Sequence, residues 1–313
     1  MMWRGITFFR PEANVQFIRR RALFLVASAL LVGFSIAFVL FRGLNFGVDF
    51  TGGIMVEVRM PAGTAELGDL RSRLSSLDLG DVSIQEFGEA DTFLARIPRQ
   101  SGGEQAQQAA VERVRGALPG AEFRRIEVVG PQVSADLLES GIFAVLGALG
   151  GILIYIWFRF EWQFGLAALS ALIHDVISTI GIFALFGFEF NLTTVAAVLL
   201  IAGYSINDTV VVFDRVRENL RRYKTLPMGE LFNRSINETL SRTVMTSATT
   251  LVAVLALYIL GGEVIRDFSF ALIWGIGIGT YSSICVALPL LMFFDLSRGD
   301  PLPVTGANPS GQP

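Results

Sequence analysis

Residues 191–213 read NLTTVAAVLLIAGYSINDTVVVF, an apolar run in which Asp208 is the only charged residue. A helix that crosses the hydrocarbon core of a bilayer needs about 20 mostly apolar residues, so this run is long enough to span a membrane. Five further runs are similarly long and apolar: 22–41, 140–158, 164–186, 243–262 and 268–294. The sequence therefore predicts an α-helical polytopic membrane protein with six transmembrane helices.

The composition supports this prediction. Of the 313 residues, 52% are hydrophobic and only 17% are charged, whereas a soluble domain carries about 25% charged residues. The net charge of −3 provides no basic surface for nucleic acid. The single cysteine, Cys285, rules out an intramolecular disulfide and any cysteine-based metal site. We expect no metal and no cofactor.

The basic residues predict how the chain is oriented in the membrane. The run 22–41 is longer than a signal-peptide core of roughly 7 to 15 residues, so we interpret it as a retained anchor. Segments 1–21 and 214–242 are rich in arginine, whereas the outer turns contain only Arg266, so both chain ends are expected to be cytoplasmic. Segment 214–242 is predicted to be an amphipathic cytoplasmic loop, and the tail 295–313 to be disordered.

The segment 42–139 is too polar for the membrane, and the predicted orientation places it in the periplasm. Strands are expected at 54–60, 82–87, 93–97 and 123–129, and helices at 64–77, with Thr64 as N-cap, and at 103–118. This βαββαβ order is that of a ferredoxin-like α+β domain. It contains no histidine and no cysteine. We therefore expect a binding or coupling domain and no enzymatic activity.

Ionisable residues within the predicted spans are candidates for function, because charge in lipid is costly. Asp208 lies near one end of its span, and Arg242 begins the next span from the same side. The two residues form a candidate proton gate, and the alternative is a static salt bridge between two helices. Asn207 and Thr246 extend the polar stripe, and His174 and Asp175 in the third span are further candidates, with Asp175 favoured as a buried partner.

The last span carries small residues at four-residue spacing, among them Gly275, Gly279 and Ser283. Such spacing is typical of a helix surface that allows close approach of another helix. The partner is either another helix of this chain or another protein. The glycines do not form a dinucleotide-binding loop, because no strand-turn-helix context surrounds them.

Several motifs resemble those of the SecD/SecF family of protein-export subunits, in its SecF form. One motif, FGVDFTGG, contains Gly47, Asp49, Phe50, Thr51, Gly52 and Gly53. The others are VGPQVS at 129–134, GYSINDTVVVFDRVREN at 203–219, SRTVMTSATTL at 241–251 and GTYSSI at 279–284. Residues 134–136 read SAD where the family tends to have a glycine and a glutamate.

The resemblance implies a protein of the bacterial inner membrane that pairs with SecD in a twelve-helix bundle similar to resistance-nodulation-division transporters. It implies that protons act as the coupling ion and drive late steps of preprotein translocation through SecYEG, with other Sec accessory proteins and membrane lipid as neighbours. It assigns the family's membrane carboxylate and arginine to Asp208 and Arg242. Two alternatives are a proton-coupled exporter of small hydrophobic molecules, for which the outer domain is small, and a structural assembly factor of the translocon.

Overall fold

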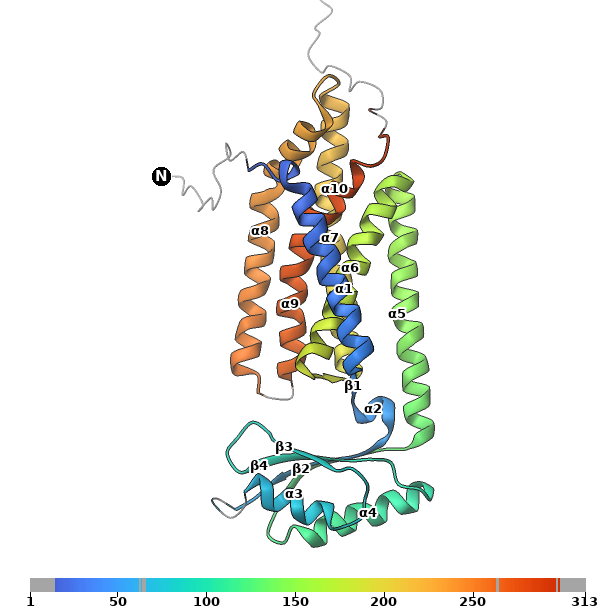
Figure 1. Cartoon of the computed structure of the whole chain (residues 1–313), viewed down its shortest axis with the longest axis vertical. Helices are drawn as coiled ribbons and strands as arrows, with labels where there is room; N and C mark the ends of the chain where they lie inside the picture. Colours follow the sequence, from blue (N-terminus) through green and yellow to red (C-terminus); the bar gives the residue numbers. More distant parts are fainter. Residues whose placement is uncertain (1–14, 62, 64–65, 263–264, 297, 299–313) are drawn as a thin grey trace, which may run out of the picture.

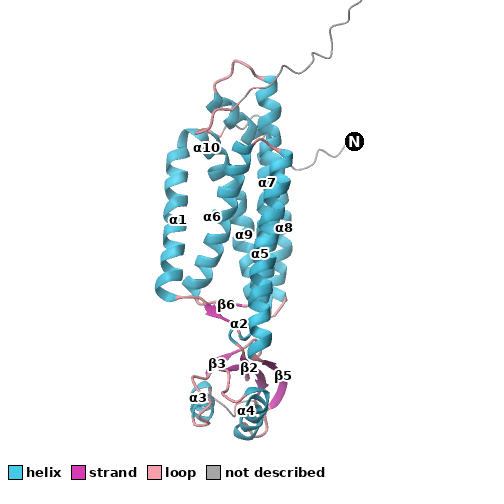
Figure 2. Ribbon diagram, turned by 90° about the vertical axis from the view of Figure 1, so that its right-hand side faces the viewer, coloured by secondary structure: helices cyan, strands magenta, loops and turns pink. Residues whose placement is uncertain are grey.

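The computed structural model describes residues 15–61, 63, 66–262, 265–296 and 298 (Figure 1). It consists of a bundle of long helices and a small sheet domain that lies beyond one end of the bundle, as Figures 1 and 2 both show. The expected N-cap Thr64 and most of the expected disordered tail lie outside the described residues.

The bundle contains the six predicted membrane helices. Within the described residues, six helices are long and apolar enough to cross a membrane, which confirms the predicted number. They are α1 (Arg21–Arg42) with the short helix η1 (Ile18–Arg20), α5 (Pro131–Arg159), α6 (Trp162–Phe186), α7 (Leu192–Arg222), α8 (Met228–Leu260), and α9 (Arg266–Ser282), which continues through the π-helical turn η3 (Ser283–Ala287) into α10 (Leu288–Leu291).

Several of these helices extend beyond the apolar runs. The segment 214–242, expected to be a loop, is largely helical, because α7 continues to Arg222 and α8 already begins at Met228. Only residues 223–227 connect the two helices. Likewise, α5 starts at Pro131, where proline is well accommodated in the first turn. Apolar length identifies the part of a helix that can lie in lipid, but polar residues continue the same helix into water.

The turn between α6 and α7 is tight and well defined. Gly187 ends α6 with a left-handed backbone at φ +71°, a conformation that glycine adopts readily. Asn191 caps α7, and its Oδ1 accepts a 3.1 Å hydrogen bond from the amide of Thr194. Between them lies the short strand β6 (Glu189–Phe190), which pairs in parallel with β1 (Asn45–Phe46), just after α1. The α6–α7 turn is thus joined to the segment that leads into the sheet domain.

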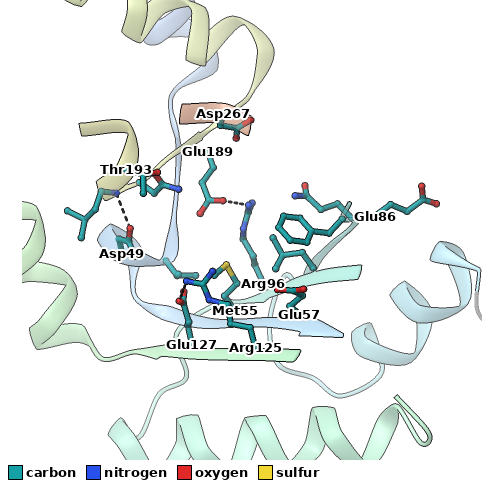
Figure 3. A pocket seen from close by; sticks show the side chains of 16 residues that line it. Asp49, Met55, Glu57, Glu86, Arg96, Arg125, Glu127, Glu189, Thr193 and Asp267 are labelled. Atoms are coloured by element: carbon teal, nitrogen blue, oxygen red, sulfur yellow. Dashed lines mark hydrogen bonds and ion pairs between the residues drawn. The ribbon is translucent and has the colours of Figure 1, made fainter. Parts of the chain in front are cut away.

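The sheet domain is a four-stranded antiparallel sheet covered by two helices on one face. In chain order its elements are β2 (Gly53–Arg59), α3 (Leu67–Ser75), β3 (Ser83–Glu86), β4 (Thr92–Ile97), α4 (Gly103–Ala117) and β5 (Glu122–Val129). The strands lie in the order β3-β4-β2-β5. Alternate residues of β2, Ile54 and Val56, are fully buried in the core that also contains Leu70 and Leu74 of α3 and Val114 of α4. The opposite face of the sheet is turned toward the helix bundle (Figure 3).

The helices of the bundle differ strongly in burial. In α6, α7 and α9 about half of the residues in the apolar 18-residue stretch of each helix are buried. In α1, α5 and α8 the buried share of that stretch is 11% or less. Close contacts of small residues join the inner helices: a Cβ atom added to Gly275 of α9 would lie 2.2 Å from Ile201 Cγ1 of α7. The apolar outer faces of α1, α5 and α8 are left for lipid or for a partner subunit.

Candidate functional site

Asp208 lies on α7 within the helix bundle. Its side chain is 3% exposed, and its Oδ2 atom is buried and has no hydrogen-bond partner among the described residues. The Ser247 hydroxyl on α8 faces its carboxylate, and Ser247 in turn lies 2.6 Å from the Thr280 hydroxyl on α9. A buried carboxylate with an unsatisfied oxygen is unfavourable unless it is neutral or paired. This position is therefore suited to a group that binds and releases a proton.

Arg242 is near Asp208 but does not form an ion pair with it. The two residues interact electrostatically, yet the described residues contain no ion pair within 4.0 Å that joins them, and the Arg242 side chain is exposed. Asn207 is also exposed. The hydroxyl of Thr246 donates to the Arg242 carbonyl of its own helix at 2.9 Å. Of the expected polar stripe, only Asp208 is buried in the bundle.

A second polar cluster lies among α6, α7 and α9, with Asp175 at its centre. Asp175 is fully buried, and its Oδ2 accepts hydrogen bonds from Ser205 of α7 at 2.5 Å and from Ser282 of α9 at 2.7 Å. Its Oδ1 lies 2.9 Å from His174 Nδ1, whereas His174 Nε2 is buried and has no partner among the described residues. Asp175 therefore ties three helices together through one carboxylate.

This cluster adjoins Asp208 through α7. Thr209, the next residue, lies 2.8 Å from the Ser283 hydroxyl in η3, and Ser205 is one helical turn before it. A Cβ atom at Gly279 would lie 3.0 Å from Ser205 Cβ. Gly275, Gly279 and Ser283 thus all face α7. The helix that packs against them belongs to this chain and not to another protein. The sequence predicts Ser283 as a helix-packing residue but does not identify Ser205 or Ser282 as hydrogen-bond partners of Asp175, because they stand out only as polar residues within apolar spans.

The FGVDFTGG motif forms the connection between the bundle and the sheet domain. Asp49 is the second residue of the short helix α2 (Val48–Thr51). Its Oδ2 accepts a 3.0 Å hydrogen bond from the backbone amide of Leu192, the first residue of α7 (Figure 3). The Gly47 amide donates to the Phe190 carbonyl at 3.0 Å. The Phe50 ring packs against Phe190, with centroids 6.1 Å apart.

The glycines of the motif are required by close contacts. A Cβ atom at Gly47 would lie 2.4 Å from Glu189 Oε1, and one at Gly53 would lie 2.6 Å from the Ile97 carbonyl oxygen. Gly52 and Gly53 also have φ values of +70° and +133°, which residues with side chains rarely adopt. Thr51 closes the turn by donating to the Gly47 carbonyl at 3.0 Å. The motif therefore places Asp49 tightly against the start of α7.

An ion pair forms a second contact between the domain and the bundle. Arg96 of β4 binds Glu189 of β6, and both side chains are mostly buried. Burial raises the pKa of Glu189 above its ordinary range, because desolvation of the carboxylate outweighs the attraction of Arg96. The carboxylates of Asp49, Asp267 and Glu127 add to this increase in the pKa.

The contact borders a cavity of about 390 Å³ between the sheet and the bundle. Its charged lining consists of six carboxylates and two arginines: Asp49, Glu57, Glu86, Glu127, Glu189 and Asp267, with Arg96 and Arg125. Figure 3 shows Arg96 rising from the sheet toward Glu189, while Arg125 pairs with Glu127 of its own strand. Sequence reasoning missed Arg96 and Glu189, because the two are far apart in the chain and neither lies in a recognised motif.

Two family profiles match the chain. The profile described as "Protein export membrane protein SecD/SecF, C-terminal" matches residues 110–297, and the one described as "SecD/SecF GG Motif" matches residues 37–60. The second match covers the FGVDFTGG segment that contacts α7. The first covers α5 to α9 and the Asp175 and Asp208 clusters.

Relatives and solved structures agree with these matches. The chain is 46% identical to the protein translocase subunit SecF of Cereibacter sphaeroides, over 93% of each chain. It is 44% identical to the translocase subunit SecDF of Brucella abortus, covering 94% of this chain and 39% of that one. The crystal structure of SecDF from Thermus thermophilus, described as a translocon-associated membrane protein, matches with a TM-score of 0.82 and 40% identity, over 91% of this chain and 39% of that one.

SecF-type sequences thus match the chain almost from end to end, and fused SecDF proteins match it over part of their length, which supports a SecD-type partner and a role in protein translocation. The chain is a multi-pass protein of the inner membrane. It belongs to the SecF branch of the SecD/SecF family of protein-export membrane proteins.

Proposed function

We propose that this chain, together with a SecD-type subunit, uses the proton motive force to drive late steps of preprotein translocation through SecYEG. The observation that carries the proposal is Asp208, a buried carboxylate with an unsatisfied oxygen in an apolar bundle. Such a group is unfavourable as a permanent charge and is tolerated where its protonation changes during work. Protons are the only coupling ion that the proposal requires, and no enzymatic step is involved.

In this proposal Asp208 binds the proton, and Arg242 is the nearby positive charge that favours its release. The exposure of Arg242 and Asn207 supports a proton path at the face that meets the partner subunit rather than one enclosed within this chain. Thr246 lies on the same stretch of α8. His174 and Asp175 lie on the inner side, where Asp175 connects α6 to α7 and α9 and His174 lies within hydrogen-bonding distance of Asp175.

We also propose that both chain ends are cytoplasmic and that the sheet domain is a periplasmic ferredoxin-like domain. Its element order and the strand order β3-β4-β2-β5 support this fold. The orientation is supported by the distribution of basic residues, which favour the cytoplasmic side. The end of the bundle away from the domain carries Arg19, Arg20, Arg21, Arg159, Arg215, Arg217, Arg221, Arg222, Lys224 and Arg234.

The test compares two aspartates of the same helix. We expect Asp208→Asn to reduce gradient-dependent preprotein export about tenfold or more, because the side chain can no longer exchange a proton. Asp214→Asn is the matched control: Asp214 is half-exposed and pairs with Arg159 at 2.6 Å near the end of the bundle away from the domain. It should keep near-normal export. The measurement is export into vesicles that contain the complete complex, with and without a proton gradient.

Assembly must be followed in parallel, by co-purification of the SecD-type subunit. If Asp208→Asn leaves export and its gradient dependence intact in a normally assembled complex, proton coupling through Asp208 is wrong. A role as a structural assembly factor of the translocon would then be favoured. Isolation as a stable homo-oligomer without a SecD-type partner would instead favour an exporter of small hydrophobic molecules.

A further inference from the structure

Two contacts cross from the sheet domain region to the start of α7. The Asp49 carboxylate accepts a 3.0 Å hydrogen bond from the backbone amide of Leu192. Arg96 of the sheet forms an ion pair with Glu189, three residues before Leu192. The first contact binds the start of α7, and the second binds the short α6–α7 turn, which also pairs with β1. We propose that Asp49 and the Arg96–Glu189 pair clamp the sheet domain to the outer end of α7, so that the domain and this helix move as one unit.

The Asp49 contact is a strong one for its position. The first amides of a helix have no partner within the helix, and they carry the positive end of its dipole. A carboxylate that accepts one of them gains both a hydrogen bond and a favourable charge interaction. The backbone on either side of Asp49 is closely packed, since added Cβ atoms at Gly47 and Gly52 would lie 2.4 Å from Glu189 Oε1 and 3.3 Å from Ser134 Oγ.

The Arg96–Glu189 contact acts at a different point of the domain. Arg96 extends from the centre of the sheet, since β4 pairs with both β3 and β2. Glu189 is surrounded by the carboxylates of Asp49, Asp267 and Glu127, so Arg96 supplies the positive charge that offsets their repulsion. Removal of Arg96 would leave a largely buried carboxylate among like charges, which is strongly unfavourable.

The clamp is connected to the proposed proton site by the helix itself. Asp208 is 16 residues beyond Leu192, or about 24 Å along a continuous helix at 1.5 Å per residue. A shift or tilt of α7 that follows a change at Asp208 would therefore reach the domain without an intervening loop. This consequence rests on the proposed function, but the clamp and its test do not.

The experiment measures whether the domain follows α7. Spin labels are placed at Gln108 of α4 and at Ala196 of α7, both exposed, in the full chain assembled with its SecD-type partner in lipid. Distances between the labels are compared for the unmodified chain, Asp49→Ala, Arg96→Ala and the double variant. We expect a single narrow distance in the first and a broadened or split distribution in the variants, widest in the double one.

Arg125→Ala is the matched control. Arg125 lines the same cavity, but its ion pair with Glu127 stays within β5, so this variant should keep the narrow distance. Asp49→Asn retains an acceptor oxygen and should broaden the distribution less than Asp49→Ala. Amide exchange gives a second readout: protection at Leu192 should fall about tenfold in Asp49→Ala, as expected for loss of one charge-assisted hydrogen bond.

Two results would overturn the clamp. One is a narrow distance in the double variant, with the domain still folded by circular dichroism. The other is equal broadening in Arg125→Ala, which would assign the effect to the charge of the sheet face in general. Neither result depends on export, so the clamp can fail while proton coupling through Asp208 holds, and the reverse is also possible.

Discussion

Two aspartates within the same bundle have opposite surroundings. Asp175 receives hydrogen bonds from two serines and lies within hydrogen-bonding distance of a histidine nitrogen, so its carboxylate is well satisfied. Asp208 has one oxygen with no partner among the described residues. Satisfied buried networks rigidify a structure, whereas an unsatisfied carboxylate is poised to change its protonation. At the residue scale, Asp175 holds the helices together, and Asp208 is suited to the proton binding that we propose for it.

This difference predicts the effect of removing Asp175. Asp175→Ala leaves the hydroxyls of Ser205 and Ser282 without their acceptor in the core, and we expect a loss of about 3 kcal/mol in the free energy of unfolding. Asp175→Asn keeps one acceptor oxygen and should lose less. Thermal unfolding of the purified complex measures both.

The control for this prediction is Asp214→Ala, which removes a half-exposed ion pair and should change stability by less than about 1 kcal/mol. If Asp175→Ala is as stable as Asp214→Ala, the serine hydrogen bonds do not hold the helices together.

At the scale of elements, the contact between α7 and α9 depends on glycine. Gly275 faces Ile201, which is almost completely buried, whereas an added Cβ atom at Gly277 would meet nothing within 4 Å. The two positions lie on different faces of one helix. A substitution at Gly275 therefore changes both the contact with α7 and the helix propensity, whereas one at Gly277 changes only the propensity. Close approach at Gly275 and Gly279 is also what brings Ser282 and Ser283 within reach of α6 and α7.

We therefore expect Gly275→Ala to destabilise the protein by about 1 to 3 kcal/mol, because α7 and α9 must separate or Ile201 must repack. Gly277→Ala should be neutral or slightly stabilising, since alanine favours helix by up to about 1 kcal/mol. Thermal unfolding of the two variants side by side tests this, and equal melting temperatures would contradict the close contact between the helices.

At the scale of the whole molecule, docking of the sheet domain depends on a carboxylate that titrates. The pKa of Glu189 is raised above its ordinary 4.5 by burial, so the docked state binds its proton more tightly than a state in which Glu189 is exposed to water. Protonation of Glu189 therefore favours docking below pH 4.5, where Arg96 still donates a hydrogen bond to it. This contribution is lost as the pH rises through the raised pKa, because the ion pair with Arg96 only partly offsets the desolvation of the charged carboxylate. Arg96, Asp49, Asp267 and Glu127 are the charged groups that act on this titration.

The width of the distance distribution between labels at Gln108 and Ala196 should consequently decrease as the pH falls from above the raised pKa of Glu189 to 4.5. In Glu189→Gln, which has no charge to titrate, this dependence should disappear. Glu86→Gln should retain it, since Glu86 lines the same cavity but is exposed. An unchanged pH dependence in Glu189→Gln would show that another group controls docking.

The sequence by itself determined the number of membrane helices, because long uncharged runs have few alternatives to spanning a bilayer. It also singled out Asp208, Asp175 and the FGVDFTGG motif, since charge within an apolar run and an unusual density of glycine are visible without coordinates. It could not show that segment 214–242 is mostly helix, because hydropathy does not report on polar helices.

Only the tertiary structure decided which polar groups meet. Asp208 and Arg242 were a candidate proton gate, with a static salt bridge as the alternative. The rotation of α8 leaves Arg242 exposed and turns Ser247 toward the carboxylate, so no salt bridge joins the two residues in the described part of the chain. Asp175 and Ser282, or Arg96 and Glu189, are about a hundred residues apart in the chain, and no local pattern links them. The physical reason is that burial depends on a residue's own polarity, whereas hydrogen bonds and ion pairs depend on the rotation and register of packed elements.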